Sequence, residues 1–342
     1  MKIKHFFLNY FCEMLIVWAS LLFFFTCPFH IKFLQPEAKK ILLYLSIAYA
    51  VIAVPLLLYK SVKGYQSKGF IAMQVILRFL KYAWTGLKAR KIINEFAPFQ
   101  ITQEEKTNIL FLLVKFIFIP IMIKYSVANF FTIEKRYALL FTSSKPLAQM
   151  LSENYFLLAV SFLLLADTIL YTIGYIFESS YLKNKIKSVD STLFGWIVAL
   201  ACYPPLNKIT GMLFPLQNEY KISFGDDTIT IIVRVVILLL LLVFTLSSFS
   251  LGFKCSNLTN RGIVKHGTYS IVRHPAYTAK ILIWWILLIP TLYHRPEGLV
   301  IIIFWTILYG LRAITEEQHL SSDPDYIDYC KNVKYRFIPG IF

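Results

Sequence analysis

Residues 261–277 read Arg261-Gly-Ile-Val-Lys-His-Gly-Thr-Tyr-Ser-Ile-Val-Arg-His-Pro-Ala-Tyr277, and residues 312–317 read Arg312-Ala-Ile-Thr-Glu-Glu317. Most of the chain before them is apolar, whereas these two stretches gather glycines, basic side chains, histidines, tyrosines and paired carboxylates. An apolar segment with a turn in its middle separates them. The contrast indicates a ligand site where two neighbouring membrane helices meet the aqueous phase.

The pair His274-Pro275 predicts the start of a helix. Proline is tolerated at the first helical position, where the backbone N–H would be unpaired anyway, and its ring disfavours helical geometry in the residue before it. The free N–H groups and partial positive charge of this helix start, beside Arg273 and His274, suit an anionic group. Arg312 and Glu316 are four residues apart and share one face of the next helix. Together these residues suit a zwitterionic ligand.

At these residues the sequence resembles the isoprenylcysteine carboxyl methyltransferase-like family of integral-membrane methyltransferases, which includes the phospholipid methyltransferases. The resemblance covers residues 155–342. It rests on the block from Arg261 to Ala279, the block from Arg312 to Leu320, and Tyr326, Tyr329, Arg336 and Pro339 in the tail. Two positions depart from the family pattern: Arg261, where many members have histidine, and Ala279, where glycine is usual.

The resemblance implies S-adenosyl-L-methionine as the cofactor and a lipophilic methyl acceptor. It implies that Arg312 orients the acceptor and that Glu316 takes the cofactor's amino group, so these two are the expected catalytic residues. The expected cofactor-binding residues are Arg261, Gly262, Ile263, Val264, Tyr269, Arg273, His274, Pro275, Ala276, Tyr277, Glu316 and Glu317. A prenylated cysteine carboxylate, a phospholipid amine, a quinone-like phenol and a small hydrophobic acid all remain open as acceptors.

The composition predicts an all-α, polytopic membrane bundle. Of 342 residues, 57% are hydrophobic and only 16% charged, which exceeds what the core of a soluble domain needs. The net charge of +16 comes from residues that lie mostly between apolar runs, which favours orientation in a bilayer and contact with anionic lipids over nucleic acid. The five cysteines form no C-x-x-C pair, so we expect small buried hydrophobes and no metal site.

Apolar runs predict about eight transmembrane helices and a short cytosolic helix that starts at Asp323-Pro324. The expected spans are residues 6–27, 41–59, 108–123, 155–177, 196–203, 229–251, 277–293 and 299–313. Residues 126–153 are interpreted as an outer connection. The chain is therefore divided into an N-terminal membrane region, 1–150, and a methyltransferase core, 151–342. Glu13 and Asp167 lie within spans, where each carboxylate requires a polar partner.

Charge sets the expected orientation in the membrane. The segment after the second span holds only basic charges, from Lys60 to Lys91, and this places it in the cytoplasm. Its polar residues recur at helical spacing opposite an apolar face, which predicts an amphipathic surface helix. Counting spans from there returns residues 252–276 to the cytoplasmic side, within reach of a soluble cofactor. We expect a multi-pass protein of a bacterial inner membrane rather than of the endoplasmic reticulum.

Two other functional classes remain open. The C-terminal half is also similar to NADPH-dependent membrane sterol and steroid double-bond reductases, sharing R-H-P, Y-x-x-Y and the ending Tyr335 to Phe342. Ala276 and Glu316-Glu317 depart from the reductase pattern, which favours the methyltransferase. A non-catalytic scaffold or transporter is the third class. The chain contains no G-x-G-x-x-G, G-x-S-x-G or H-E-x-x-H motif, which argues against a Rossmann nucleotide site and the common hydrolases.

Overall fold

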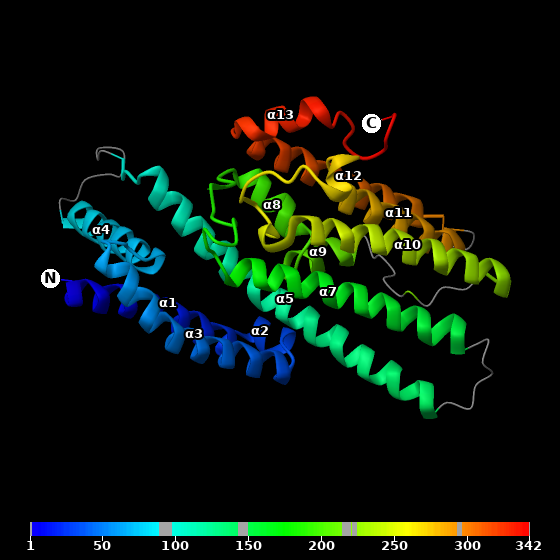
Figure 1. The fold of residues 1–342 in the computed structure, drawn as a ribbon, viewed down its shortest axis with the longest axis horizontal. Helices are drawn as coiled ribbons and strands as arrows, with labels where there is room; N and C mark the ends of the chain where they lie inside the picture. The colour runs from blue at the N-terminus through cyan, green and yellow to red at the C-terminus, as the bar shows by residue number, and fades with distance from the viewer. Residues whose placement is uncertain are drawn as a thin grey trace. The chain divides into compact units, whose positions relative to one another are not determined.

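The computed structural model describes residues 2–88, 98–142, 150–213, 220, 224–292 and 296–341. Across these residues the protein is almost entirely helical (Figure 1), which confirms the predicted all-α class. The chain forms two compact units, Met1–Pro120 and Ile121–Phe342. Their boundary lies inside the long helix α5 (Gln103–Thr142). The division at residue 150 inferred from composition stays a prediction.

The first unit is built on packing between helices close in sequence. Its helices are α1 (Lys2–Thr26), α2 (Pro28–Phe33), α3 (Pro36–Val62), α4 (Lys68–Lys88) and the first half of α5. Glu13 on α1 accepts hydrogen bonds from the Tyr49 hydroxyl at 3.3 Å and from the Gly69 N–H at 3.1 Å. This carboxylate therefore joins α1 to α3 and α4, as predicted for an acid inside a span.

Helix α4 is the predicted amphipathic helix. Gly69, Ile71, Ala72 and Val75 are its buried residues, whereas Arg78 extends to a 2.7 Å ion pair with Glu105 at the start of α5. The interpretation of residues 126–153 as a connection is wrong for 126–142, because α5 continues without interruption to Thr142. Charged residues there, such as Glu134 and Lys135, are compatible with helix, and neither glycine nor proline follows Pro120 within it.

The second unit contains the regions singled out in the sequence. Its elements after α5 are a π-helical turn (Met150–Tyr155), α7 (Phe156–Ile176), β1 (Ser188–Val189), α8 (Leu193–Ala201), α9 (Leu206–Leu213), α10 (Asp227–Leu251), a 3-10 turn (Gly252–Lys254), β2 (Thr259–Asn260), a second 3-10 turn (Gly267–Ser270), α11 (Pro275–Leu292), α12 (Gly298–Leu320) and α13 (Pro324–Asn332). Three of the starts were predicted from local chemistry or apolar runs: Pro275, Pro324 and the region of Asp227.

Six helices among the described residues are long and apolar enough to cross a membrane. They are Ile3–Thr26, Pro36–Ser61, Gln103–Thr142, Glu153–Ile176, Asp227–Lys254 and Gly298–Leu320. The apolar segment Pro275–Pro290 of α11 is shorter. The expected short span at 196–203 is α8, whose nine residues rise only about 14 Å, less than half of a bilayer core. It therefore does not cross a membrane by itself, and the number of long spans is smaller than the eight expected.

The core of the second unit lies among α7, α8, α10, α11 and α12, which Figure 1 shows running beside one another. Ile237 and Ile302 are fully buried there. The ring of Trp284 on α11 lies edge-on to Trp305 and Tyr309 on α12, with centroids 5.6 and 5.1 Å apart. Such edge-on ring contacts stabilise the packing beyond the contribution of the buried area, and they fix α11 against α12.

Two short strands position the loops above this core. Ser188 and Val189 pair antiparallel with Asn260 and Thr259, so the loop after α7 lies beside the loop after α10. Within the bundle, Asp167 on α7 accepts a hydrogen bond from the Ser248 hydroxyl on α10. The predicted need of Asp167 for a polar partner is thereby met.

Candidate functional site

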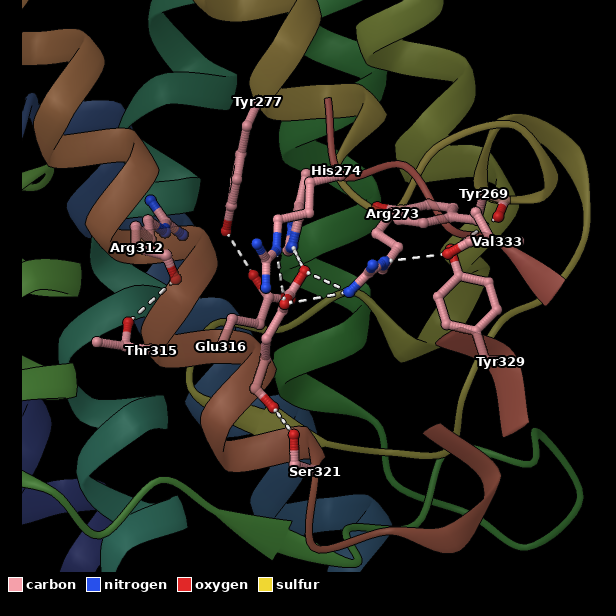
Figure 2. Close-up of polar contacts among 12 residues, drawn as sticks. Tyr269, Arg273, His274, Tyr277, Arg312, Thr315, Glu316, Ser321, Tyr329 and Val333 are labelled. Atoms are coloured by element: carbon pink, nitrogen blue, oxygen red, sulfur yellow. Dashed lines mark hydrogen bonds and ion pairs between the residues drawn. The ribbon is translucent and has the colours of Figure 1, made fainter. Parts of the chain in front are cut away.

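The start of α11 meets the end of α12, and polar side chains from both helices converge there (Figure 2). The Tyr277 hydroxyl donates a 2.8 Å hydrogen bond to Oε2 of Glu316. The His274 ring stacks on the Tyr277 ring, with an interplanar angle of 5° and centroids 5.4 Å apart. The two sequence stretches that were predicted to form one site are therefore brought together on the same side of the bundle.

Glu316 is an exposed carboxylate in this cluster. Within the part of the chain that the structure describes, no cation forms an ion pair with it, and Tyr277 supplies its one hydrogen bond. A carboxylate that faces a cavity without a cation is suited to a positively charged ligand group, because a charged hydrogen bond is stronger than a neutral one.

Glu317 has a different environment from its neighbour. Its buried carboxylate lies 3.1 Å from His274 Nε2, 3.2 Å from Arg273 Nη1 and 3.0 Å from Arg336 Nε. Three partners from two separate parts of the chain thus surround one carboxylate. Both of its oxygens are used, so Glu317 joins α12 to the start of α11 and to the C-terminal tail.

Arg273 completes this connection to the tail. Its Nε donates to the Val333 carbonyl at 3.0 Å and its Nη2 donates to the Lys334 carbonyl at 2.6 Å. The backbone N–H groups of Arg273 and His274 donate to the carbonyls of Tyr335 and Arg336. We define these contacts, together with Glu317, as the tail clasp. The guanidinium of Arg273 is engaged by protein groups, and it holds the tail in place.

Arg312 is a buried cation surrounded by aromatic rings. Its guanidinium carbon lies 5.2 Å from the centroid of Tyr277, 5.3 Å from Tyr203 and 5.7 Å from Tyr309. Its Nη2 donates to Oδ1 of Asn257. Among the described residues, no carboxylate lies within ion-pair distance of Arg312. A buried guanidinium without a counter-ion is costly unless an anion joins it, so its position favours an anionic ligand.

A cavity opens between these groups. It is lined by Tyr171, Asp190, Gly195, Ala199, Leu251, Ser256, Asn257, Leu258, Thr259, Tyr269, His274, Ala276, Tyr277, Arg312, Thr315, Glu316, His319 and Leu320. Six predicted site residues are therefore at its wall: Tyr269, His274, Ala276, Tyr277, Arg312 and Glu316. The other predicted residues, Arg261, Gly262, Ile263, Val264, Arg273, Pro275 and Glu317, lie around the cavity without lining it.

The segment from Arg261 to Val264 does not line the cavity, and its contacts are with the loops and the helix α13 that surround it. Arg261 is 4% exposed and donates at 3.5 Å to the carbonyls of Asn184 and Phe253, so it joins the loops after α7 and α10. Gly262 has a φ of +94°, a conformation that favours glycine. Ile263 packs on the cluster of Tyr326, Tyr329 and Val333 in α13 and the following turn.

Tyr269 connects the cavity to α13. Its carbonyl accepts a 2.7 Å hydrogen bond from the Tyr329 hydroxyl, and its ring packs against the same cluster. Burial raises the pKa of the Tyr269 hydroxyl well above its ordinary value. The group therefore stays protonated near neutral pH and can donate a hydrogen bond, but it is not a general base.

Sequence reasoning missed two residues that contact Arg312, Asn257 at the cavity wall and Tyr203 outside it. Asn257 accepts a hydrogen bond from Arg312 through its side-chain oxygen. Its side-chain Nδ2 and its backbone N–H donate to the Tyr175 hydroxyl at 2.6 and 2.9 Å. Tyr203, which follows α8, covers the Arg312 guanidinium. The polar run from Ser256 to Asn260, between an apolar helix and the glycine-containing stretch, was a signal for Asn257. Nothing adjacent in sequence pointed to Tyr203, because its role depends on how α8 packs.

The fold and this site define an integral membrane protein of the all-α class, whose polar cluster and cavity lie at the ends of two apolar helices. Residues 229–323 match the sequence model of the phospholipid methyltransferase family. The match confirms, over that segment, the predicted resemblance to the integral-membrane methyltransferases, and it supports a membrane methyltransferase. It includes α11, α12 and all predicted site residues. No curated protein gives a significant match to the chain.

Proposed function

We propose that this protein is an S-adenosyl-L-methionine-dependent methyltransferase that acts on a lipophilic acceptor, at a site facing the cytoplasm. One observation carries the proposal. The carboxylate of Glu316 and the guanidinium of Arg312 lie one helical turn apart at the same cavity, and neither has an ion-pair partner among the described residues. Four residues of α-helix rise about 6 Å. This spacing lets the two side chains contact opposite charges, either on one small ligand or on two ligands that lie side by side.

The residues present fit this cofactor. When bound, S-adenosyl-L-methionine supplies an electrophilic methyl group, whose transfer leaves the sulfur with the bonding electron pair. The Glu316 carboxylate would accept hydrogen bonds from the cofactor's ammonium group. The backbone N–H groups of Ala276 and Tyr277 belong to the first turn of α11, where α-helical geometry gives them no acceptor. They are suited to hold its carboxylate.

The tail clasp supports this assignment of roles. Because Arg273 donates to Glu317 and to two tail carbonyls, its contribution is to fix the start of α11. The direct contacts of Arg261 and Glu317 are likewise to protein groups. We therefore propose that Arg261, Arg273 and Glu317 position the cofactor-binding residues, whereas Tyr269, His274, Ala276, Tyr277 and Glu316 contact the cofactor.

Arg312 would act on the acceptor. Its positive charge favours an ionised acceptor group, and an ionised carboxylate or phenolate needs no general base before it attacks a methyl group. The three tyrosine rings around Arg312 restrict its movement and keep water from it. Holding the acceptor in a fixed orientation is worth up to roughly 7–11 kcal/mol of the activation barrier. Positioning of the acceptor by Arg312, rather than proton transfer, would account for the acceleration of methyl transfer.

The proposal is tested with the purified full-length protein and membrane extracts. We expect S-adenosylhomocysteine to bind in a calorimetric titration, and labelled methyl groups to pass from the cofactor to a lipid-soluble product. Arg312→Met should lower this incorporation by at least about 100-fold while S-adenosylhomocysteine still binds, because the Glu316 carboxylate and the backbone N–H groups proposed to hold the cofactor remain. Binding of NADPH without binding of S-adenosylhomocysteine would overturn the proposal in favour of a reductase, and binding of neither would favour a scaffold.

A further inference from the structure

The cavity has a second polar end, two turns along α12 from Arg312. Arg312, Glu316 and His319 are spaced by four and three residues and all line the cavity, so they share one face of α12. His319 lies about 10 Å further along the helix axis than Arg312. The Nε2 of its ring is 2.9 Å from the Ser188 hydroxyl on β1. This contact places the short ladder of β1 and β2 against the end of α12.

Asp190 follows β1 and lines this end of the cavity. Its backbone N–H donates to the Leu258 carbonyl at 2.8 Å, which extends the ladder by one residue. Because side chains alternate along a strand, Asp190 and Ser188 lie on the same face, and that face meets His319. The Asp190 carboxylate is close enough to act electrostatically on the His319 ring. Strand and helix thus bring both side chains to one place.

One oxygen of the Asp190 carboxylate has no hydrogen-bond partner among the described residues. Asp190 is only 4% exposed, and its Oδ1 accepts hydrogen bonds from the Thr192 N–H at 2.8 Å and from the Thr192 hydroxyl at 2.7 Å. Its Oδ2 accepts none and lies over Gly195, where an added Cβ would overlap it. A buried carboxylate oxygen without a donor is costly. The position of Oδ2 therefore favours a donor supplied by a ligand.

Two hydroxyl groups of the cavity wall have the same property. Ser256 and Thr259 both line the cavity, and their hydroxyl oxygens are buried without a hydrogen-bond partner in the part of the chain that the structure describes. Buried polar atoms of native proteins almost always have such a partner. We define Asp190, Ser256, Thr259 and His319 as the ladder end of the cavity. Its charged acceptor, together with hydroxyls that both donate and accept, suits a ligand group that carries several hydroxyls.

We propose that the ladder end binds the ribose of the cofactor's adenosine, and that Asp190 Oδ2 accepts hydrogen bonds from its adjacent 2′ and 3′ hydroxyls. The inference rests on the proposed function and deepens it, because it assigns residues to the nucleoside part of the ligand. A carboxylate holds a ribose hydroxyl in the same way in dinucleotide-binding folds. Asp190 lies outside the matched residues 229–323, so its role is specific to this chain. The assignment leaves Arg312, at the other end of the cavity, for the acceptor.

Calorimetric titration of the full-length protein with S-adenosylhomocysteine and with its 2′,3′-dideoxy analogue measures what the hydroxyls contribute. We expect the wild type to bind S-adenosylhomocysteine at least about tenfold more tightly, because hydrogen bonds to a charged group are the stronger ones. Asp190→Asn should bring this ratio close to one, since asparagine keeps an oxygen for Thr192 but replaces the charged acceptor with an amide donor. Asp328→Asn is the matched control, because the exposed Asp328 pairs with Lys331 and does not line the cavity.

The ratio of the two affinities distinguishes recognition of ribose from a structural role of Asp190. A variant that is merely less well folded would bind both ligands more weakly and keep the ratio. An unchanged ratio in Asp190→Asn would therefore overturn the inference. Equal affinity of the wild type for the two ligands would overturn it as well, and that comparison needs no variant.

Adenosine and 2′,3′-dideoxyadenosine separate this result from a failure of the proposed function, because neither carries the amino acid part of the cofactor. If S-adenosylhomocysteine binds but the hydroxyls make no difference, the methyltransferase proposal stands and the ribose assignment is wrong. If the protein prefers adenosine to dideoxyadenosine by at least about tenfold but does not bind S-adenosylhomocysteine, the nucleoside site stands and the reaction is wrong.

Discussion

The hydrogen bond from the Tyr277 hydroxyl to Glu316 Oε2, 2.8 Å long, joins the first turn of α11 to the end of α12. Opposite termini of two consecutive helices meet in this way only if the chain reverses direction between them. Arg273 and Glu317 are in contact at 3.2 Å in the same region. The arrangement of both sequence stretches on one side of the bundle, on which the proposed function depends, is therefore a property of the fold.

Glu316→Gln should weaken binding of S-adenosylhomocysteine by about 10- to 150-fold, because a hydrogen bond to a charged group is worth roughly 1.5–3 kcal/mol. Calorimetric titration of the purified protein measures the change. Glu297→Gln is the matched control, since Glu297 is an exposed carboxylate at the other end of α12. Unchanged affinity in Glu316→Gln would contradict the role given to this carboxylate.

Glu317→Gln should release the tail clasp. Removing one charge from a buried group of ion pairs typically costs about 3–5 kcal/mol, which corresponds to at least about 100-fold faster opening. Hydrogen exchange reports it directly, because the N–H groups of Arg273 and His274 donate to tail carbonyls. We expect both amides to exchange faster in Glu317→Gln and to stay protected in Glu316→Gln. Equal protection in the two variants would show that Glu317 does not hold the tail.

Gly267→Ala should destabilise the second unit by more than about 1 kcal/mol, since a side chain there is strained by the φ of +65° and would overlap Ser250 on α10. Gly310→Ala in α12 is the control. Apart from the backbone of α12 itself, no heavy atom of the described residues lies within 4 Å of an added Cβ there, and alanine favours helix over glycine by about 1 kcal/mol. Thermal unfolding in detergent should rank Gly310→Ala at or above the wild type and Gly267→Ala below it.

Asp323 is predicted to make the stability of the folded protein depend on pH. Burial opposes its ionisation, but hydrogen bonds from Lys187 at 2.8 Å and from Asn260 at 2.8 Å outweigh burial and hold the pKa of this carboxyl below its ordinary value. The hydrogen bond to Asp323 raises the pKa of Lys187. A lowered carboxyl pKa contributes stability that is present above about pH 4 and is lost as the pH falls through the folded-state value.

The corresponding measurement is the free energy of unfolding between pH 7 and pH 3 in the wild type and in Asp323→Asn. The wild type should lose stability over the acidic part of this range, and the variant should lose less, because it has no carboxyl to protonate at this position. Parallel curves for the two proteins would mean that Asp323 does not contribute to the acid sensitivity.

The elements predicted from sequence were those set by local chemistry. Proline after His274 and after Asp323 fixed two helix starts, and Asp323 caps α13 by accepting from the N–H of Asp325. Apolar runs located the long helices, because a helix that crosses a bilayer core needs about 20 mostly apolar residues. The extension of α5 to Thr142 was missed, since a mixed polar segment has no periodicity that distinguishes helix from connection.

The partners of individual side chains were harder to predict. The sequence pattern predicted that Arg273 contacts an anionic ligand group. In the structure its guanidinium donates hydrogen bonds to the carbonyls of Val333 and Lys334, about sixty residues away. Glu316 and Glu317 are adjacent and chemically identical, and only the packing of α12 directs one to the cavity and the other to the clasp. Such differences depend on contacts between distant segments, which one sequence does not reveal.

The contacts between α11 and α12 at the site end have a consequence for how the hairpin is aligned. A slip of either helix by one turn, about 5.4 Å, would separate Tyr277 from Glu316 and Arg273 from Glu317. These contacts therefore fix the alignment of the hairpin at its site end, in addition to the contacts of Trp284 with Trp305 and Tyr309. Insertions near Glu297, at the bend, should be accommodated without loss of alignment, whereas a single inserted residue between Tyr309 and Glu316 would rotate the carboxylate out of the cavity.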